Sequence, residues 1–170
     1  MKTFQGSINV CSVEGRPTFF NLTQNLDNIV RDARVNNGVC VIYTHHTTCS
    51  IIIEEFSHDI TENGLEYLQQ DLCNAMQKFI PMQTQNNIYL HPGPKHIDNA
   101  LCNVKEKEAS VCLNTDAHLR SCILGRSETV IIANGKLDLG KFASVYFIDW
   151  DQIRSRERKI SVYIIGEEDA

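Results

Sequence analysis

The chain has 170 residues, of which 42% are hydrophobic and 22% are charged, and its formal net charge is −5. This composition is typical of a folded domain and excludes the class of disordered chains, which have low hydrophobicity and high charge. The acidic balance argues against general nucleic-acid binding, because phosphate neutralisation needs a basic surface. We expect one domain over residues 1–170.

The N-terminal residues lack the apolar run of a signal peptide, and the longest apolar run, residues 39–43, is too short to cross a bilayer. We therefore expect a cytoplasmic protein. The cysteines are spread along the chain without a Cys-x-x-Cys pair, which predicts reduced thiols, several of them small buried residues. They are Cys11, Cys40, Cys49, Cys73, Cys102, Cys112 and Cys122.

The first half of the chain predicts several strands and two helices. Residues 3–20 indicate two short strands around a turn at 14–17, followed by an amphipathic helix that Asn21 or Thr23 could cap and that ends near residues 37–38. Residues 39–44 predict a central strand that is apolar on both faces, with residues 50–54 as its continuation or partner. A longer helix is expected from about residue 59 to residue 80, where Pro81 stops it.

The second half predicts a loop, more strands and one short helix. Residues 83–103 are rich in Pro, Gly and Asn, with a candidate strand at 87–90 and a turn at 91–94. Residues 109–113 indicate a strand, and Asn114 is expected to cap a short helix that ends before Gly125. Asn134-Gly135 is the signal of a type I′ hairpin between residues 128–133 and 136–139, and further strands are expected at 142–148 and 159–165.

Strands in runs with few helices between them predict an α+β fold, a mostly antiparallel β-sandwich with two main helices and one short helix. No internal repeat or linker is visible in the sequence.

Histidines are the residues most suited to chemistry in this sequence. His45 and His46 follow the central strand, and because neighbouring side chains of an extended backbone point to opposite faces, only one of them can line a given site. The pattern does not choose between them, and both could simply finish the strand. His118 lies near the positive end of the helix capped by Asn114, where an anion is favoured, although it could also be a half-buried histidine of an apolar face.

Four blocks of residues, taken in their order along the chain, match the pattern of a known family. They are His46-Thr47-Thr48 followed by Glu55, Ala117-His118-Leu119 running into Leu124-Gly125 and Ser127, Gly135-x-Leu137-x-Leu139-Gly140, and Arg158 leading to Gly166-Glu167. In order and spacing these blocks resemble the YjbQ-like family, whose members are called secondary thiamine-phosphate synthases. The resemblance implies a compact α+β fold that assembles as a homotrimer, with a site near the subunit boundary.

The resemblance also implies roles for individual residues. It makes His46 and His118 the motif histidines and Glu55 the motif acid, all three catalytic, and it gives Arg158 an anion-binding role that Asn114 would share from the helix N-terminus. A divalent metal ion, Zn or Mg, is a candidate cofactor. Its candidate ligands are His46, His118 and His91, with His96 or Cys122 as alternatives to His91.

The chain also departs from the family pattern. Where the family has Leu-Gly-Thr-Trp-Gln, this sequence has Leu139-Gly140-Lys141-Phe142-Ala143, so an indole and an amide are replaced.

Arg154, Arg156 and Arg158 alternate, and three guanidiniums on one strand face would form an anion-binding row. For Arg154 and Arg156, the alternative is a position in a solvated hairpin.

Cys122 lies four residues after His118 and so could share its helix face. It is either a possible metal ligand or a small buried thiol.

Two functions follow from these observations. The first is an enzyme of the thiamine-phosphate-synthase type, a transferase acting on a small phosphorylated or pyrophosphorylated molecule, in which His46 and His118 transfer protons. The alternative is a non-catalytic homotrimer that binds a metal or a small ligand. We expect the partners to be other copies of the chain and a small anionic ligand, with neither nucleic acid nor membrane.

Overall fold

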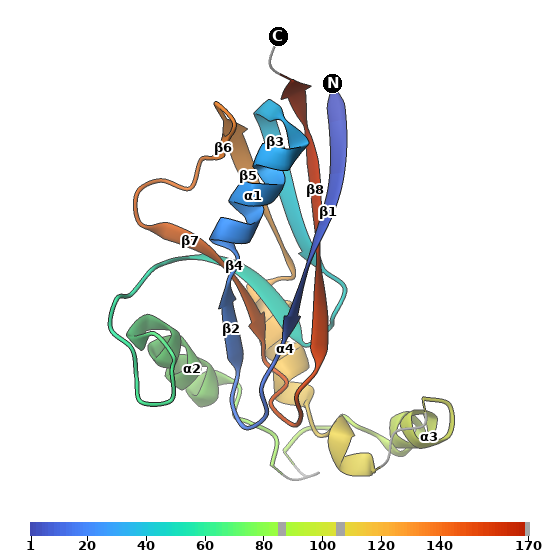
Figure 1. Ribbon diagram of the computed structural model, residues 1–170. Coiled ribbons are helices and arrows are strands. Elements are labelled where there is room, and N and C mark those ends of the chain that lie inside the picture. The colour runs from blue at the N-terminus through green and yellow to red at the C-terminus, as the bar shows by residue number, and fades with distance from the viewer. Residues whose placement is uncertain (85–87, 105–107, 169–170) are drawn as a thin grey trace.

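The computed structural model describes residues 1–84, 88–104 and 108–168, and it has an α+β fold with two antiparallel sheets (Figure 1). One sheet has the strand order β1-β8-β3-β5-β6 and the other has the order β2-β7-β4. The strands are β1 (Lys2–Cys11), β2 (Thr18–Asn21), β3 (Val35–Thr44), β4 (Cys49–Glu55), β5 (Ser127–Ala133), β6 (Lys136–Leu137), β7 (Ala143–Asp149) and β8 (Glu157–Glu168). The helices are α1 (Thr23–Ala33), α2 (Tyr67–Phe79), α3 (Pro94–Cys102), the 3-10 helix η1 (Ala109–Cys112) and α4 (Thr115–Leu124). The predicted α+β class and antiparallel sheets are confirmed.

The core lies between the two sheets and α1. In β8 the even-numbered side chains from Arg158 to Ile164 are buried, while the odd-numbered ones face outward, as the period of two in a strand requires. Helix α1 covers the inner face with Leu26, Val30 and Ala33. Strand β8 therefore has one face in the core and an outer face that carries mostly polar side chains.

The first predicted helix is shorter than expected, because residues 35–38 belong to β3. Arg34 has a left-handed backbone with φ of 51°, which ends α1 one residue before the strand. Gly38 fits this strand because it packs against β8, where an added Cβ would lie 2.2 Å from the carbonyl oxygen of Ile165. The expected central strand is confirmed, with β3 between β8 and β5.

Two other expectations in the first half need correction. Strand β4 is neither a continuation nor a partner of β3, because it pairs with β7 in the second sheet. The long helix begins at Tyr67 instead of residue 59. Glu66 explains this start, since its side chain and that of Gln69 form a reciprocal capping box at the first turn.

In the second half, the hairpin and the last two strands are confirmed, and two elements differ. Asn134 and Gly135 have φ of 52° and 71°, as a type I′ turn requires. Residues 109–112 form a 3-10 helix instead of a strand, and α3 was not predicted, although Pro94 stands in its first turn, a position that proline favours. The candidate strand at 87–90 is a bend over residues 88–90, and residue 87 lies outside the described residues.

All seven cysteines are free thiols. Cys40, Cys49 and Cys112 are buried, as expected of small core residues, whereas Cys11, Cys102 and Cys122 are exposed. Across the described ranges, none of the helices combines the length and the apolar character that a membrane crossing needs.

Candidate functional site

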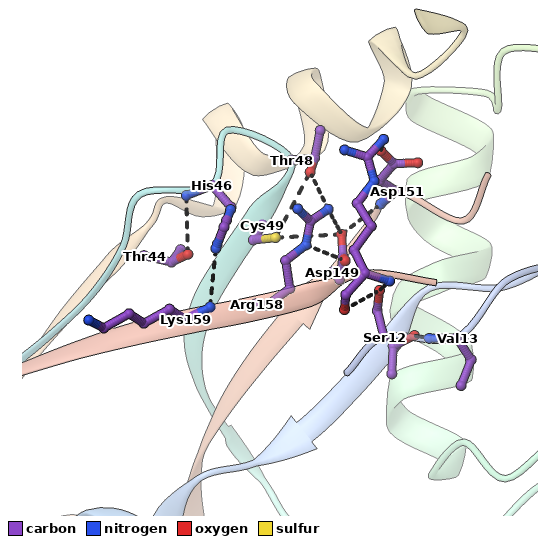
Figure 2. Close-up of polar contacts among 12 residues, drawn as sticks. Ser12, Val13, Thr44, His46, Thr48, Cys49, Asp149, Asp151, Arg158 and Lys159 are labelled. Carbon is purple, nitrogen blue, oxygen red and sulfur yellow. Dashed lines mark hydrogen bonds and ion pairs between the residues drawn. The ribbon is translucent and has the colours of Figure 1, made fainter. Parts of the chain in front are cut away.

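A buried ion pair lies at the start of β8, where Arg158 meets Asp149 from the end of β7 (Figure 2). The guanidinium donates Nε to Oδ2 at 2.7 Å and Nη2 to Oδ1 at 3.2 Å. Nη2 also donates to the hydroxyl of Thr48 at 3.3 Å. Burial lowers the pKa of Arg158, but the hydrogen bonds and charge of Asp149 outweigh it and leave the pKa raised. The guanidinium is therefore charged and held in one orientation.

A second carboxylate extends this network toward α4. Asp151 accepts Nδ2 of Asn114 at 3.1 Å and pairs with Nη2 of Arg156 at 3.1 Å. Its backbone N–H donates to Asp149 Oδ1 at 3.1 Å. The Asn114 side chain makes no capping hydrogen bond to α4, so its amide ties the helix start to the segment between β7 and β8.

His46 lies in the turn after β3 and is held by the backbone of β8. The N–H of Lys159 donates to Nε2 of His46 at 3.1 Å, and Figure 2 shows the imidazole directed at this nitrogen. An imidazole that accepts at Nε2 carries its proton on Nδ1. Burial and the positive charge of Arg158 lower the pKa of His46. His46 is therefore a neutral imidazole whose free group is the Nδ1–H donor.

A hollow of about 450 Å³ adjoins this histidine on the outer side of β1 and β8. Charged residues of opposite sign line it, among them Lys159 and, at the start of β8, Glu157. The lining residues are Asn9, Val10, Cys11, His46, Glu157, Arg158 and Lys159. We call this hollow the His46 pocket.

His118 reaches the same turn from α4. Its side chain forms a hydrogen bond to the backbone of Thr47, the residue after His46. This bond raises the pKa of His118, as expected when a ring N–H donates to a carbonyl, but burial has the larger effect and lowers the pKa overall. The other ring nitrogen of His118 is then free to accept a proton. The two motif histidines therefore lie on the two sides of one turn, while His45 is exposed and packs edge-on against Tyr43.

His118 belongs to a cluster of three histidines with His91 and His96. The ring centroid of His91 lies 5.8 Å from that of His118 and 4.4 Å from that of His96. Burial, followed by the charges of His96 and His118, lowers the pKa of His91. Its Nε2 is buried and has no hydrogen-bond partner among the described residues.

Gln83 fixes the position of His91, a role that no sequence pattern predicts. Its Nε2 donates to the His91 carbonyl at 2.9 Å, and its Oε1 accepts the N–H of Thr115 at 2.9 Å. Its backbone N–H donates to Asp116 at 3.2 Å. Gln83 thus takes the capping role that we expected of Asn114. A glutamine 32 residues before a helix start is not a local capping signal, so only the tertiary structure could show it.

Glu55 does not join these residues within one chain. Glu55 is exposed and is the last residue of β4, whereas Cys49 is the first. The two residues lie about 20 Å apart along an extended strand. Glu55 pairs with Ala143, next to Phe142, which is 63% exposed. The residues that replace the family Trp-Gln pair therefore lie beside the motif acid, at the other end of β4 from the histidines.

The predicted arginine row and Cys122 have surroundings that differ from those expected. Arg154 and Arg156 precede β8, so the three arginines do not form a row on one strand, and Arg156 pairs with Asp151. The expected solvated hairpin is also wrong for Arg156, whose side chain is only 26% exposed in this pair. Cys122 is exposed, contrary to the expectation of a buried thiol.

The predicted metal ligands fit a metal only in part. His118 and His91 each have a ring nitrogen suited to zinc, but His46 already accepts a hydrogen bond at Nε2 and carries its proton on Nδ1. Within the described residues, no group of three or more His, Cys, Asp or Glu side chains is arranged to hold a metal ion. The set His46, His118 and His91 is therefore not a preformed metal site.

Comparison with known proteins identifies the family. The chain is 28% identical over 152 residues to the UPF0047 protein of Methanocaldococcus jannaschii, covering 89% of this chain and 88% of the relative. A UPF0047 protein of Archaeoglobus fulgidus is 29% identical over 132 residues, which cover 76% of this chain and 81% of that protein.

Solved structures agree with these sequence matches. A crystal structure from Clostridium acetobutylicum, described as an uncharacterised conserved protein of the YjbQ/UPF0047 family, has a TM-score of 0.65 at 25% identity and covers 95% of this chain and 99% of that chain. A hypothetical protein from Aeropyrum pernix K1 has the same fold, with a TM-score of 0.69 at 22% identity, covering 96% and 99%. A family model described as "UPF0047 protein YjbQ-like" matches residues 7–167, and the chain belongs to this family.

Proposed function

We propose that this protein is a cytoplasmic enzyme that acts on a small phosphorylated or pyrophosphorylated molecule, a transferase of the thiamine-phosphate-synthase type. The observation that carries the proposal is the fixed state of His46, whose Nε2 accepts the Lys159 N–H and whose Nδ1–H is left as a donor. Lys159 lines the same pocket, and its long side chain can bring an ammonium group to a bound anion. A neutral N–H donor beside a flexible cation suits a phosphate oxygen.

In this proposal His118 transfers the proton and His46 binds the anion. His118 donates to the Thr47 backbone through one ring nitrogen, and its lowered pKa favours a neutral ring with a free lone pair at pH 7. His46 cannot take a proton at Nε2 without losing the hydrogen bond from Lys159. We therefore assign the general-base role to His118.

Arg158 has a positioning role in this proposal. Its Nε and its Nη2 each donate one hydrogen bond to Asp149, and the two bonds direct the guanidinium into the protein. The pair fixes the first residues of β8, and so the backbone N–H of Lys159 that holds His46. We therefore assign to Lys159 the anion-binding role that was expected of Arg158. The same role is unsupported for Asn114, because its side-chain amide donates a hydrogen bond to Asp151.

A homotrimer would explain why the motif residues form two separate groups. One chain places His46 and His118 at one end of β4 and Glu55 at the other. Ile53, Phe56 and Phe142 near Glu55 are 40%, 40% and 63% exposed, which leaves an apolar area that a neighbouring subunit would cover. We propose that a site at the subunit boundary receives Glu55 from the adjacent copy.

A thermal-shift titration with pyrophosphate tests the anion site. Bound anion should raise the Tm of the wild type by mass action on the folded state. Lys159→Gln should lose most of this shift, whereas Lys136→Gln removes the same charge from exposed β6 of the same sheet and should keep it. Equal shifts in the two variants would remove Lys159 from the site. The absence of a shift in the wild type would contradict the phosphate-handling function.

The histidine cluster supports the second candidate, a protein that binds a metal or small ligand without catalysis. The supporting observation is the buried Nε2 of His91, which finds no partner among the described residues and whose ring lies 5.8 Å from that of His118. Calorimetry with zinc should then show binding that His91→Ala and His118→Ala each abolish. Zinc binding combined with no turnover of phosphorylated compounds would favour this candidate over the enzyme.

A further inference from the structure

We propose that the outer face of the β1–β8 strand pair is a second subsite, which binds the hydroxylated part of a phosphorylated ligand such as a sugar phosphate or polyol phosphate. This inference rests on the phosphate-binding part of the proposed function, because the phosphate itself would lie in the His46 pocket, and it replaces the thiamine-type substrate with a polyol phosphate. It adds the chemical class of the group that the phosphate carries.

A second hollow of about 460 Å³ lies along these two strands and shares Lys159 with the His46 pocket. Its lining residues are Gln5, Gly6, Ser7, Lys159, Ser161, Val162 and Tyr163. The side chains are set by register, since Gln5 faces Tyr163, Ser7 faces Ser161 and Asn9 faces Lys159 across the antiparallel pair. Directly opposite residues share one sheet face, so the two hollows form one trough with Lys159 at their junction.

The chemistry of this trough matches hydroxyl groups. Gln5, Ser7, Ser161 and Tyr163 each have a side chain that both donates and accepts hydrogen bonds, as a ligand hydroxyl does. None of these four side chains is engaged by another group within the described ranges of the chain. Val162 lines the hollow only through its backbone, because its side chain is buried on the opposite face. The side chains along the β1–β8 floor are therefore polar and available.

The charge of the trough favours an anionic ligand over a cationic aromatic one. Lys159 is the only charged residue that lines the second hollow, and all of the lining residues are described. A thiazolium or similar ring cation would find no carboxylate there. The carboxylate residue Glu157 lines the His46 pocket at the other end of the trough. The lining thus favours a neutral polyol attached to the phosphate.

Calorimetry with three ligands tests this inference: inorganic phosphate, ribose 5-phosphate and thiamine monophosphate. Ribose 5-phosphate should bind at least about 10-fold more tightly than inorganic phosphate, as two additional hydrogen bonds would give. The double variant Ser161→Ala/Tyr163→Phe should reduce ribose 5-phosphate to the affinity of inorganic phosphate and leave inorganic phosphate unchanged. The control Thr129→Ala alters an outward-facing hydroxyl on β5 of the same sheet and should change neither affinity.

The outcomes separate this inference from the proposed function. If wild type binds phosphate and ribose 5-phosphate equally, or thiamine monophosphate most tightly, the hydroxyl subsite is wrong while the phosphate site stands. If neither phosphate compound binds, the proposed function fails and the subsite with it. Sedimentation velocity of the double variant should match the wild type. A change in mass would assign this face to a subunit contact and overturn the subsite.

Discussion

Replacing Arg158 with Met removes one member of the buried pair and leaves the other without its partner. Arg158 is 6% exposed and Asp149 is fully buried, so water cannot take the place of the guanidinium. The variant loses two hydrogen bonds to Asp149 and one to Thr48. Breaking a buried ion pair from one side costs about 3–5 kcal/mol, much of it the penalty of an unpaired buried charge. For a chain of 170 residues this corresponds to a Tm lowered by about 10 °C.

Urea unfolding of a double-mutant cycle measures this effect. We expect Arg158→Met to lower the free energy of unfolding by about 3–5 kcal/mol. The double variant Arg158→Met/Asp149→Leu should be less destabilised than Arg158→Met alone, because it removes the unpaired carboxylate. It should not regain full stability, since Asp149 also accepts the Asp151 N–H. A loss below about 1 kcal/mol in the single variant would place the pair in the weak class of surface salt bridges and refute the positioning role.

The remaining predictions concern pH, thiols and assembly. Burial lowers the pKa of His91 and of His118, so the unfolded chain binds protons first as the pH falls. The free energy of unfolding should therefore be highest above the ordinary histidine pKa of about 6.5 and decrease below it, with a smaller decrease in His91→Gln/His118→Gln; equal slopes would contradict this. Burial raises the pKa of Cys40 to about 12, so Ellman's reagent should label three exposed thiols of the native protein quickly and Cys40 only on unfolding. The fast thiols are Cys11, Cys102 and Cys122. Sedimentation should give the mass of a trimer, and a monomer at micromolar concentration would remove the shared site.

The sequence predicted the elements whose signals are local. The type I′ hairpin followed from Asn134-Gly135, and the short helix followed from the apolar spacing before Gly125. Strand pairing was harder to predict, because the apolar residues of β4 do not indicate whether the strand pairs with β3 or with β7. The start of α2 was missed because Glu66 caps it, and α4 begins where expected although Gln83, not the Asn114 side chain, accepts the N–H of its first residue.

The candidate site was predictable as a set of residue types but not as a set of roles. Family motifs pointed to His46 and His118, and the structure places them on the two sides of the turn at Thr47. Their roles depend on hydrogen bonds between residues far apart in sequence, such as the Lys159 N–H that occupies Nε2 of His46. The ion pair between Arg158 and Asp149 could not be predicted for the same reason, because the two residues lie on different strands and no local pattern links them.

A crystal structure with pyrophosphate tests the central claim, that the His46 pocket binds a phosphate group. We predict density for the anion within hydrogen-bond distance of Nδ1 of His46 and Nζ of Lys159, with Arg158 still paired to Asp149. Arg158 turned away from Asp149 to bind the anion would contradict its positioning role. Anion bound only elsewhere, with the His46 pocket lacking it at saturating concentration, would contradict the account as a whole.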